Sequence, residues 1–163
     1  MDSTKSVVDG SFSKFGIVPR QFQYTAALSV LEGHDVFVSV PTGSGKTFSY
    51  CLLPDMFGTL CSDTQSVIVV ITPLVSLMVD QVERMQSLQI KAAFVGEAQK
   101  DKAIIDGVTQ GQYHIVYMSP EAAIDSHWRK LFSSELYQRH LRAIVIDECH
   151  CIHEWYACNF PLH

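Results

Sequence analysis

The stretch VPTGSGKT, Val40 to Thr47, constrains the fold of this chain more than any other part of its sequence. The apolar run VFVSV over 36–40 leads into it, and the apolar-rich run FSYCLLP follows. Glycines let a chain turn tightly, so a strand that leaves such a turn as a helix exposes backbone N–H groups at the positive end of the helix dipole. The stretch therefore predicts a phosphate-binding loop, with a strand over 36–40 before it and a helix from Lys46 to about 54–58 after it.

This loop supplies a candidate cofactor-binding set. The set consists of Thr42, Gly43, Ser44, Gly45, Lys46 and Thr47. We expect Lys46 to reach the outer phosphates of a nucleotide, and Thr47 to offer its hydroxyl to Mg²⁺, which prefers hard oxygen ligands. The loop departs from the pattern G-x-x-x-x-G-K-T at its first position, where Val40 replaces glycine. The alternative interpretation is a glycine turn with an exposed lysine that binds no phosphate.

Alternating strand and helix patterns in the rest of the chain predict its fold class. Continuous apolar runs, typical of strands covered on both faces, occur at 66–72, 92–95, 114–118 and 142–147. Apolar residues at helical spacing separate these runs over 74–88, 102–110 and 128–141. This order predicts an α/β fold in which helices cover both faces of a parallel sheet.

Composition excludes some classes of protein. No apolar run approaches the ~20 residues that a helix needs to span a bilayer, so we expect no membrane segment. Seventeen acidic residues against twelve Lys and Arg give a net charge of −5, which does not favour nonspecific nucleic-acid binding. Five cysteines without regular spacing fit reduced thiols, and the N-terminus has no signal-peptide pattern. We therefore expect an intracellular protein.

A pair of acidic residues completes the candidate catalytic set. The run IVIDECH places Asp147 and Glu148 at the carboxyl end of an apolar strand, and this end of a parallel sheet faces the same crevice as the phosphate loop. We expect Asp147 to hold Mg²⁺ through water, and Glu148 to orient and deprotonate the water that attacks the γ-phosphate of ATP. With Lys46 they form the predicted catalytic residues. The alternative is that the two carboxylates only end a strand and cap a helix.

Four stretches resemble, in order, the motifs of superfamily 2 helicases. VPTGSGKT resembles motif I, TPLVSLMVDQV (72–82) motif Ia, YMSPE (117–121) motif Ib and DECHCIHEW (147–155) motif II. They look most like the RecQ family of ATP-dependent DNA helicases, of the DExH-box type. Upstream, FGIVPRQFQ (15–23) resembles that family's motif 0, which implies that Arg20 and Gln23 contact the adenine side of ATP. A glutamine amide can pair with the N6 and N7 edge of adenine.

The resemblance also implies a domain organisation and a partner. Residues 15–163 look like a first RecA-like domain, the helicase ATP-binding domain, after an N-terminal extension of residues 1–14. Single-stranded or forked DNA would be the partner, ATP and Mg²⁺ the cofactors, and the nucleus the location. Similarity to motif Ia implies that Pro73 and Ser76 contact the DNA backbone, and Trp155 would stack on an unpaired base. The alternatives are that 74–82 is only an amphipathic helix and that Ser119 in YMSPE only caps a helix.

The match to the family weakens at the end of the sequence. RecQ relatives show Trp-Gly-His-Asp-Phe-Arg, whereas Phe160 here lies one residue farther from Trp155 and no arginine follows. The 163 residues contain neither a second RecA-like domain nor an arginine finger in a matching motif, and such a finger contributes about 10³–10⁵ in rate. We therefore expect these residues alone to bind ATP, to hydrolyse it weakly or not at all, and to unwind no duplex.

Other functions compete with this interpretation. An RNA helicase shares the phosphate loop and the DExH box, and a non-catalytic module would bind ATP or nucleic acid without turnover. A P-loop kinase should have an arginine-rich lid and needs neither Gln23 nor the DECH sequence. Cysteines and histidines crowd residues 149–158, but their spacing fits no zinc-finger plan, so we do not expect zinc.

Overall fold

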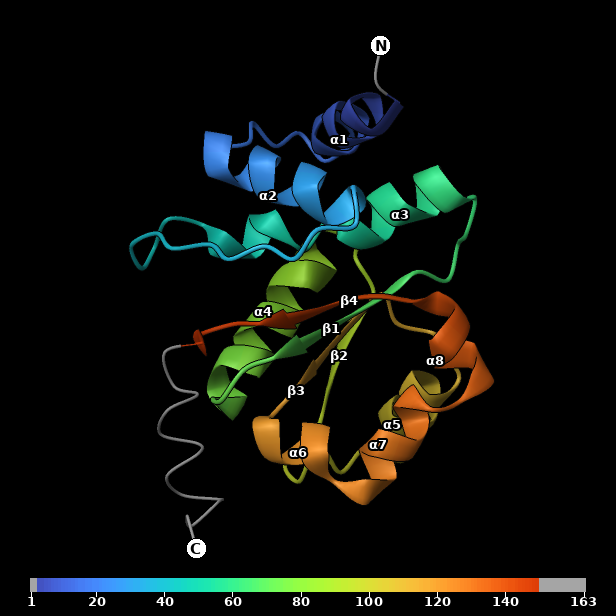
Figure 1. Cartoon of the computed structure of the whole chain (residues 1–163). Helices are drawn as coiled ribbons and strands as arrows, with labels where there is room; N and C mark the ends of the chain where they lie inside the picture. The colour runs from blue at the N-terminus through green and yellow to red at the C-terminus, as the bar shows by residue number, and fades with distance from the viewer. Residues whose placement is uncertain (1–2, 150–163) are drawn as a thin grey trace, which may run out of the picture.

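A computed structural model describes residues 3–149 of the chain (Figure 1). Its sheet consists of β1 (Val67–Ile71), β2 (Ala92–Val95), β3 (Ile115–Met118) and β4 (Leu141–Ile146). The strands lie in the order β2-β3-β1-β4, and every pair is parallel. The α/β fold with a parallel sheet that the sequence predicts is confirmed.

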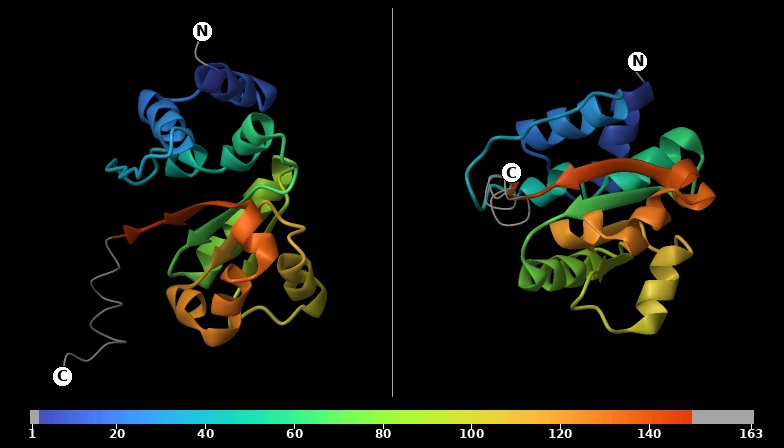
Figure 2. Two further views of the ribbon diagram at one scale, coloured as in Figure 1. Left: turned by 45° about the vertical axis from the view of Figure 1, so that its right-hand side comes forward. Right: turned by 60° about the horizontal axis from the view of Figure 1, so that its bottom comes forward.

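Two helical layers cover the sheet, as Figures 1 and 2 show from three sides. The layer on one face comprises α1 (Ser3–Lys14), α2 (Gln21–Leu31), the 3₁₀ helix η1 (Lys46–Ser49), α3 (Leu53–Cys61) and α4 (Val75–Ser87). The layer on the other face comprises α5 (Lys102–Thr109), α6 (Pro120–Ile124), α7 (Ser126–Phe132) and α8 (Glu135–His140). Helices therefore lie on both faces, as predicted.

The central strand β1 explains why the sheet forms. Its first four residues are fully buried, and its side chains alternate between two cores. Ile68 and Val70 pack in the core beneath α1–α4, whereas Val67 and Val69 pack in the core beneath α5–α8. Full burial of such a side chain contributes about 1.5–3 kcal/mol, so a continuous apolar run is stable only in this covered position.

The predicted strand over 36–40 is wrong. This segment has no regular secondary structure, and the side chain of Phe37 is 79% exposed. It faces β4, which is an edge strand of the described sheet, across a groove of about 1490 Å³. An apolar run forms a strand only when a neighbouring strand satisfies its backbone groups, and among residues 3–149 nothing pairs with 36–40.

Two predicted helices are each divided. The single helix expected after Lys46 is the short η1, a turn, and then α3. Pro54 lies in the first turn of α3, where its missing N–H costs nothing, and this position starts a new helix. The helix expected over 128–141 is divided into α7 and α8, because the hydroxyl of Ser134 caps the backbone N–H of Tyr137.

Of the residues assigned to an N-terminal extension, Ser3–Lys14 form α1, which packs on α3 and α2. Val8 and Phe12 of α1 are buried in the core, and the hydroxyl of Ser11 donates to Asp55 Oδ2 at 2.7 Å. Lys14 forms an ion pair with the same carboxylate. The boundary at residue 14 stays a prediction. Within residues 3–149 no helix is both long and apolar enough to cross a membrane.

Candidate nucleotide-binding site

The predicted phosphate loop is a tight turn that depends on its glycines. Gly43 and Gly45 adopt φ angles of 78° and 82°, in the left-handed region that other L-residues rarely adopt. The backbone N–H of Ser44 donates to Pro41 O at 3.2 Å, which closes the turn. Thr42 and Gly43 are exposed at its tip, and Thr47 is buried at its base. The loop therefore presents backbone groups to solvent while it is anchored in the core.

Gln23 holds this loop to α2. Its side chain is buried, and its Nε2 donates to Gly45 O at 2.8 Å. Its Oε1 accepts from the backbone N–H of Arg20, also at 2.8 Å, while the Arg20 side chain stays exposed. The structure thus gives Gln23 a role in shaping the loop that its sequence does not reveal. Contact of Arg20 and Gln23 with adenine stays a prediction.

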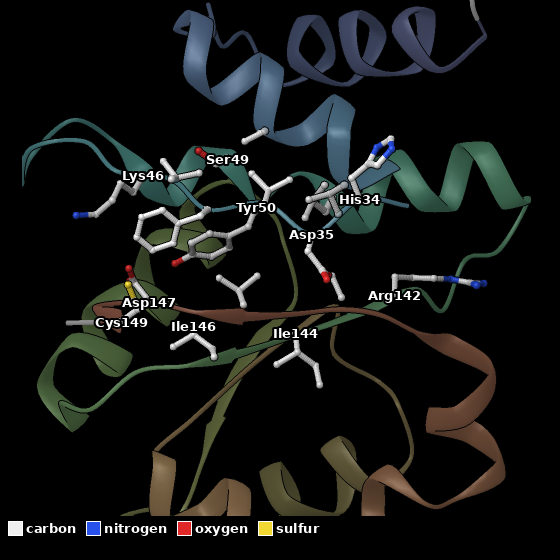
Figure 3. A pocket seen from close by; sticks show the side chains of 18 of the residues that line it. His34, Asp35, Lys46, Ser49, Tyr50, Arg142, Ile144, Ile146, Asp147 and Cys149 are labelled. Carbon is white, nitrogen blue, oxygen red and sulfur yellow. The ribbon is translucent and has the colours of Figure 1, made fainter. Parts of the chain in front are cut away.

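The groove between 34–40 and β4 brings the predicted catalytic residues together. Lys46, Ser49 and Tyr50 line it from the phosphate-loop side, and Asp147 and Glu148 line it from the end of β4. Figure 3 shows Lys46 and Asp147 at the same end of this groove. One hundred residues separate them in the sequence. Asp147 reaches the groove from the carboxyl end of β4, whereas Lys46 reaches it from the loop after the unpaired segment 36–40.

The acidic pair lies in a strained turn that closes the end of β4. The backbone N–H of Asp147 donates to Ile71 O at 2.9 Å, and that of Glu148 donates to Asp147 Oδ1 at 3.1 Å. Glu148 has a φ of 58°, which is uncommon for a residue with a side chain. Such strain persists only where the surrounding structure imposes it, and it is concentrated at functional sites.

Electrostatics single out Asp147. Burial raises the pKa of this carboxyl, and the adjacent charge of Glu148 raises it further. The backbone N–H of Glu148 and the charge of Lys46 act in the opposite direction and lower it. A half-buried carboxylate whose pKa is raised gains stability from a nearby cation.

The oxygen donors here suit Mg²⁺. The hydroxyl of Thr47 and the carboxylate of Asp147 are hard ligands, and Mg²⁺ uses one or two protein ligands together with waters and phosphate oxygens. Within residues 3–149 no group of three His, Cys, Asp or Glu side chains could hold a metal ion. Of the Cys and His residues weighed for zinc, only Cys149 falls within the described part of the chain.

The candidate nucleic-acid residues lie at the same edge of the sheet. Pro73 and Ser76 follow the carboxyl end of β1, and Ser76 is exposed at the start of α4. The backbone N–H of Thr72 donates to Met118 O at 3.0 Å, which ties this turn to β3. Ser119 caps α6, with its hydroxyl accepting from Ala122 N at 3.2 Å, so the helix-start interpretation of YMSPE is confirmed. Trp155 and Phe160 lie outside the described residues.

Two residues that sequence reasoning missed lie next to this site. Tyr50 and Tyr117 each sit in an apolar run, where a tyrosine is interpreted as part of the core, and both are buried. Their hydroxyls have no hydrogen-bond partner within residues 3–149. Only the position of the hydroxyls beside Asp147, and not the sequence pattern, identifies them.

Comparison with known proteins gives consistent matches. The family model of the DEAD/DEAH box helicases matches residues 20–160. ATP-dependent helicase SGS1 of Saccharomyces cerevisiae is 38% identical over 144 residues, which is 86% of this chain and 10% of that protein. ATP-dependent DNA helicase RecQ of Haemophilus influenzae is 33% identical over 139 residues, which is 83% of this chain and 21% of that protein. RecQ-like DNA helicase blm-1 of Caenorhabditis elegans is 35% identical over 94% of this chain and 16% of its own length.

A solved structure matches as well. The DUF1998 helicase MrfA bound to DNA and AMPPNP superimposes with a TM-score of 0.70 and 26% identity, over 92% of this chain and 22% of that one. The chain thus spans between 10% and 22% of the length of these four proteins. The resemblance to RecQ helicases is confirmed, and the chain belongs to the DEAD/DEAH box helicase family.

Proposed function

We propose that these residues are the ATP-binding half of a RecQ-like, ATP-dependent DNA helicase, in which ATP hydrolysis drives strand separation. The observation that carries the proposal is the meeting of Lys46 with Asp147 and Glu148 in one groove. The DNA helicases among its relatives support DNA as the partner. The neighbour bound to DNA and AMPPNP supports a nucleotide and DNA on this type of domain.

The chain's own residues divide the work of hydrolysis. Backbone N–H groups of 43–47 surround the phosphates, and Lys46 stabilises the negative charge that develops on them. Thr47, and Asp147 through a water, would hold Mg²⁺, and the metal would neutralise negative charge on the phosphates. Glu148 accepts the proton of the attacking water, and the strained turn fixes its orientation.

The exposed turn after β1 is the proposed contact with DNA. Ser76 can donate its hydroxyl to a backbone phosphate, and Pro73 shapes the turn. Trp155 is proposed to stack on an unpaired base. Because the chain spans at most 22% of these proteins, the second RecA-like domain and its arginine fingers would come from polypeptide outside these residues. A nuclear location is proposed from the eukaryotic relatives, although a bacterial RecQ matches too.

Single-turnover ATP hydrolysis, measured with and without single-stranded DNA, tests this proposal. We expect slow hydrolysis by these residues alone. Hydrolysis should be faster with DNA in a polypeptide that also contains a second RecA-like domain. Glu148→Gln should retain ATP binding and lose hydrolysis, since it keeps the shape of the side chain but not the base. Stimulation of hydrolysis by RNA alone would contradict DNA as the partner. ATP binding without any turnover, even when a second RecA-like domain is present, would contradict the proposed ATP hydrolysis.

A further inference from the structure

A cluster of buried hydroxyls lies behind the candidate magnesium site. Tyr50 and Tyr117 are 5% and 0% exposed, and neither hydroxyl oxygen makes a hydrogen bond of normal distance and angle within residues 3–149. A buried hydroxyl without a partner destabilises the folded state, and native proteins contain few of them. Two such tyrosines in one core therefore require an explanation beyond packing.

The backbone fixes these hydroxyls around Asp147. Tyr117 on β3 pairs in register with Val70 of β1. Asp147 is hydrogen-bonded through its backbone to Ile71, the residue before Thr72. In Figure 3 the ring of Tyr50 is oriented so that its hydroxyl points toward Asp147. Tyr50, Tyr117 and Asp147 thus lie near one another at the carboxyl end of the sheet.

Both tyrosines remain neutral donors here. Burial is the main cause that raises the pKa of Tyr50 and of Tyr117, and the charge of Asp147 raises the pKa of each further. The hydroxyls of Tyr50 and Tyr117 also interact with each other, and that of Tyr50 with Thr47, but without the distance and angle of a full hydrogen bond. A neutral phenol can donate one hydrogen bond to a carboxylate, and such a bond to a charged acceptor is strong.

We propose that Tyr50 and Tyr117 are positioning residues for Asp147, whose carboxylate accepts their hydrogen bonds, directly or through a water, when magnesium and nucleotide are bound. This inference rests on the proposed function, because it concerns the same site. The donors hold the carboxylate in the orientation that a metal-bound water requires.

A tyrosine on the opposite face of the sheet provides a matched control. Tyr137 is also 0% exposed, but its hydroxyl donates to Val108 O at 2.9 Å. It belongs to the core beneath α5–α8, whereas Tyr50 and Tyr117 belong to the core beneath α1–α4. Burial alone therefore does not leave a tyrosine hydroxyl without a partner in this protein.

Three substitutions test the inference: Tyr50→Phe, Tyr117→Phe and Tyr137→Phe. The affinity for a fluorescent ATP analogue is measured with Mg²⁺ and with EDTA, beside the melting temperature. Tyr50→Phe and Tyr117→Phe should weaken binding with Mg²⁺ by about two- to tenfold and leave binding in EDTA unchanged. Their melting temperatures should stay the same or rise, because neither hydroxyl makes a full hydrogen bond in the folded protein.

Tyr137→Phe should behave in the opposite way. It should lower the melting temperature by about 2–6 °C and leave both affinities unchanged. Equal affinities in Mg²⁺ for Tyr50→Phe, Tyr117→Phe and the unsubstituted protein would overturn the inference, and so would an equal loss in Mg²⁺ and EDTA. Two independent variants keep the test decisive if one does not fold. If the unsubstituted protein does not bind the analogue, the proposed function itself fails.

Discussion

Two apolar runs of the same length adopt different structures in this protein. VIVVI at 67–71 is β1, which is paired on both sides, and its first four residues are fully buried. VFVSV at 36–40 has no secondary structure, and Phe37 is 79% exposed. The difference shows that an apolar run predicts a strand only for a segment that other parts of the protein cover. Whether it becomes a strand depends on neighbours that satisfy its backbone groups.

The two regions also differ in what their residues do. Substitutions in β1 should change stability, since its side chains fill both cores. Substitutions from 36 to 47 should change ligand binding more than stability, because this segment is largely exposed and contains the phosphate loop. Functional segments are commonly drawn from the less stable parts of a fold.

The largest expected effect on stability comes from Ile68→Ala. Ile68 is 0% exposed, and truncation of such a side chain lowers the free energy of unfolding by about 2–5 kcal/mol. Phe37→Ala is the matched change in the unpaired run and should alter it by less than about 0.5 kcal/mol. Urea denaturation measures both. Similar losses for the two variants would show that 36–40 is covered after all.

A smaller effect is expected at Asp63, which joins the segment before β1 to the start of β4. His140 Nδ1 and Arg142 Nη2 lie 2.9 Å and 2.6 Å from Asp63 Oδ2. Partial burial by itself would raise the pKa of this carboxyl, but hydrogen bonds from His140, the backbone N–H of Gln65 and Arg142 hold it well below its usual range. Asp63→Asn should lower the free energy of unfolding by about 1–2 kcal/mol at pH 7.

The pH dependence of this effect has a definite sign. A carboxyl whose pKa is lowered on folding stabilises the folded state above its unfolded pKa of about 3.9. That stabilisation is lost as the pH falls from there toward the folded pKa. The difference in the free energy of unfolding between Asp63→Asn and the unsubstituted protein should therefore shrink as the pH falls from about 5 to about 3, roughly one unit on either side of 3.9. A difference that grows on acidification would contradict the ion-pair account.

Gly45→Ala should have a still smaller effect on stability and a larger one on ligand binding. Its φ of 82° is strained for alanine, and a Cβ there would lie 3.0 Å from Gln23 Nε2. We expect a loss of about 1 kcal/mol in stability and at least a tenfold loss in ATP affinity, a change of about 1.4 kcal/mol. Gly10→Ala in α1, where a Cβ meets nothing within 4 Å, should instead stabilise by about 0.5–1 kcal/mol. Titration calorimetry and urea denaturation separate the two effects.

The sequence predicted the paired strands well, because burial on both faces leaves a continuous apolar signal. All four strands lie within a residue or two of the predicted runs. The prediction of a strand at 36–40 was wrong because a strand needs a second segment to pair with. The prediction of one helix after Lys46 was wrong because Pro54 starts a new helix.

The same limits apply to the site. The sequence predicted that Lys46 and Asp147 lie together, and both line one groove. Only Asp147 follows a strand of the sheet, however, because the strand predicted before Lys46 is absent. Other features of the site depend on side-chain positions in three dimensions, which no spacing in the sequence encodes. They are the hydrogen bond from Gln23 to Gly45 O and the buried hydroxyls of Tyr50 and Tyr117.

Nucleotide affinity of Lys46→Ala, measured with Mg²⁺ beside the melting temperature, tests the central claim most directly. If the turn at 43–47 and Asp147 form one triphosphate site, affinity should fall at least tenfold, about 1.4 kcal/mol, while the melting temperature stays within about 2 °C. A variant that melts normally and still binds ATP as tightly as the unsubstituted protein would contradict it.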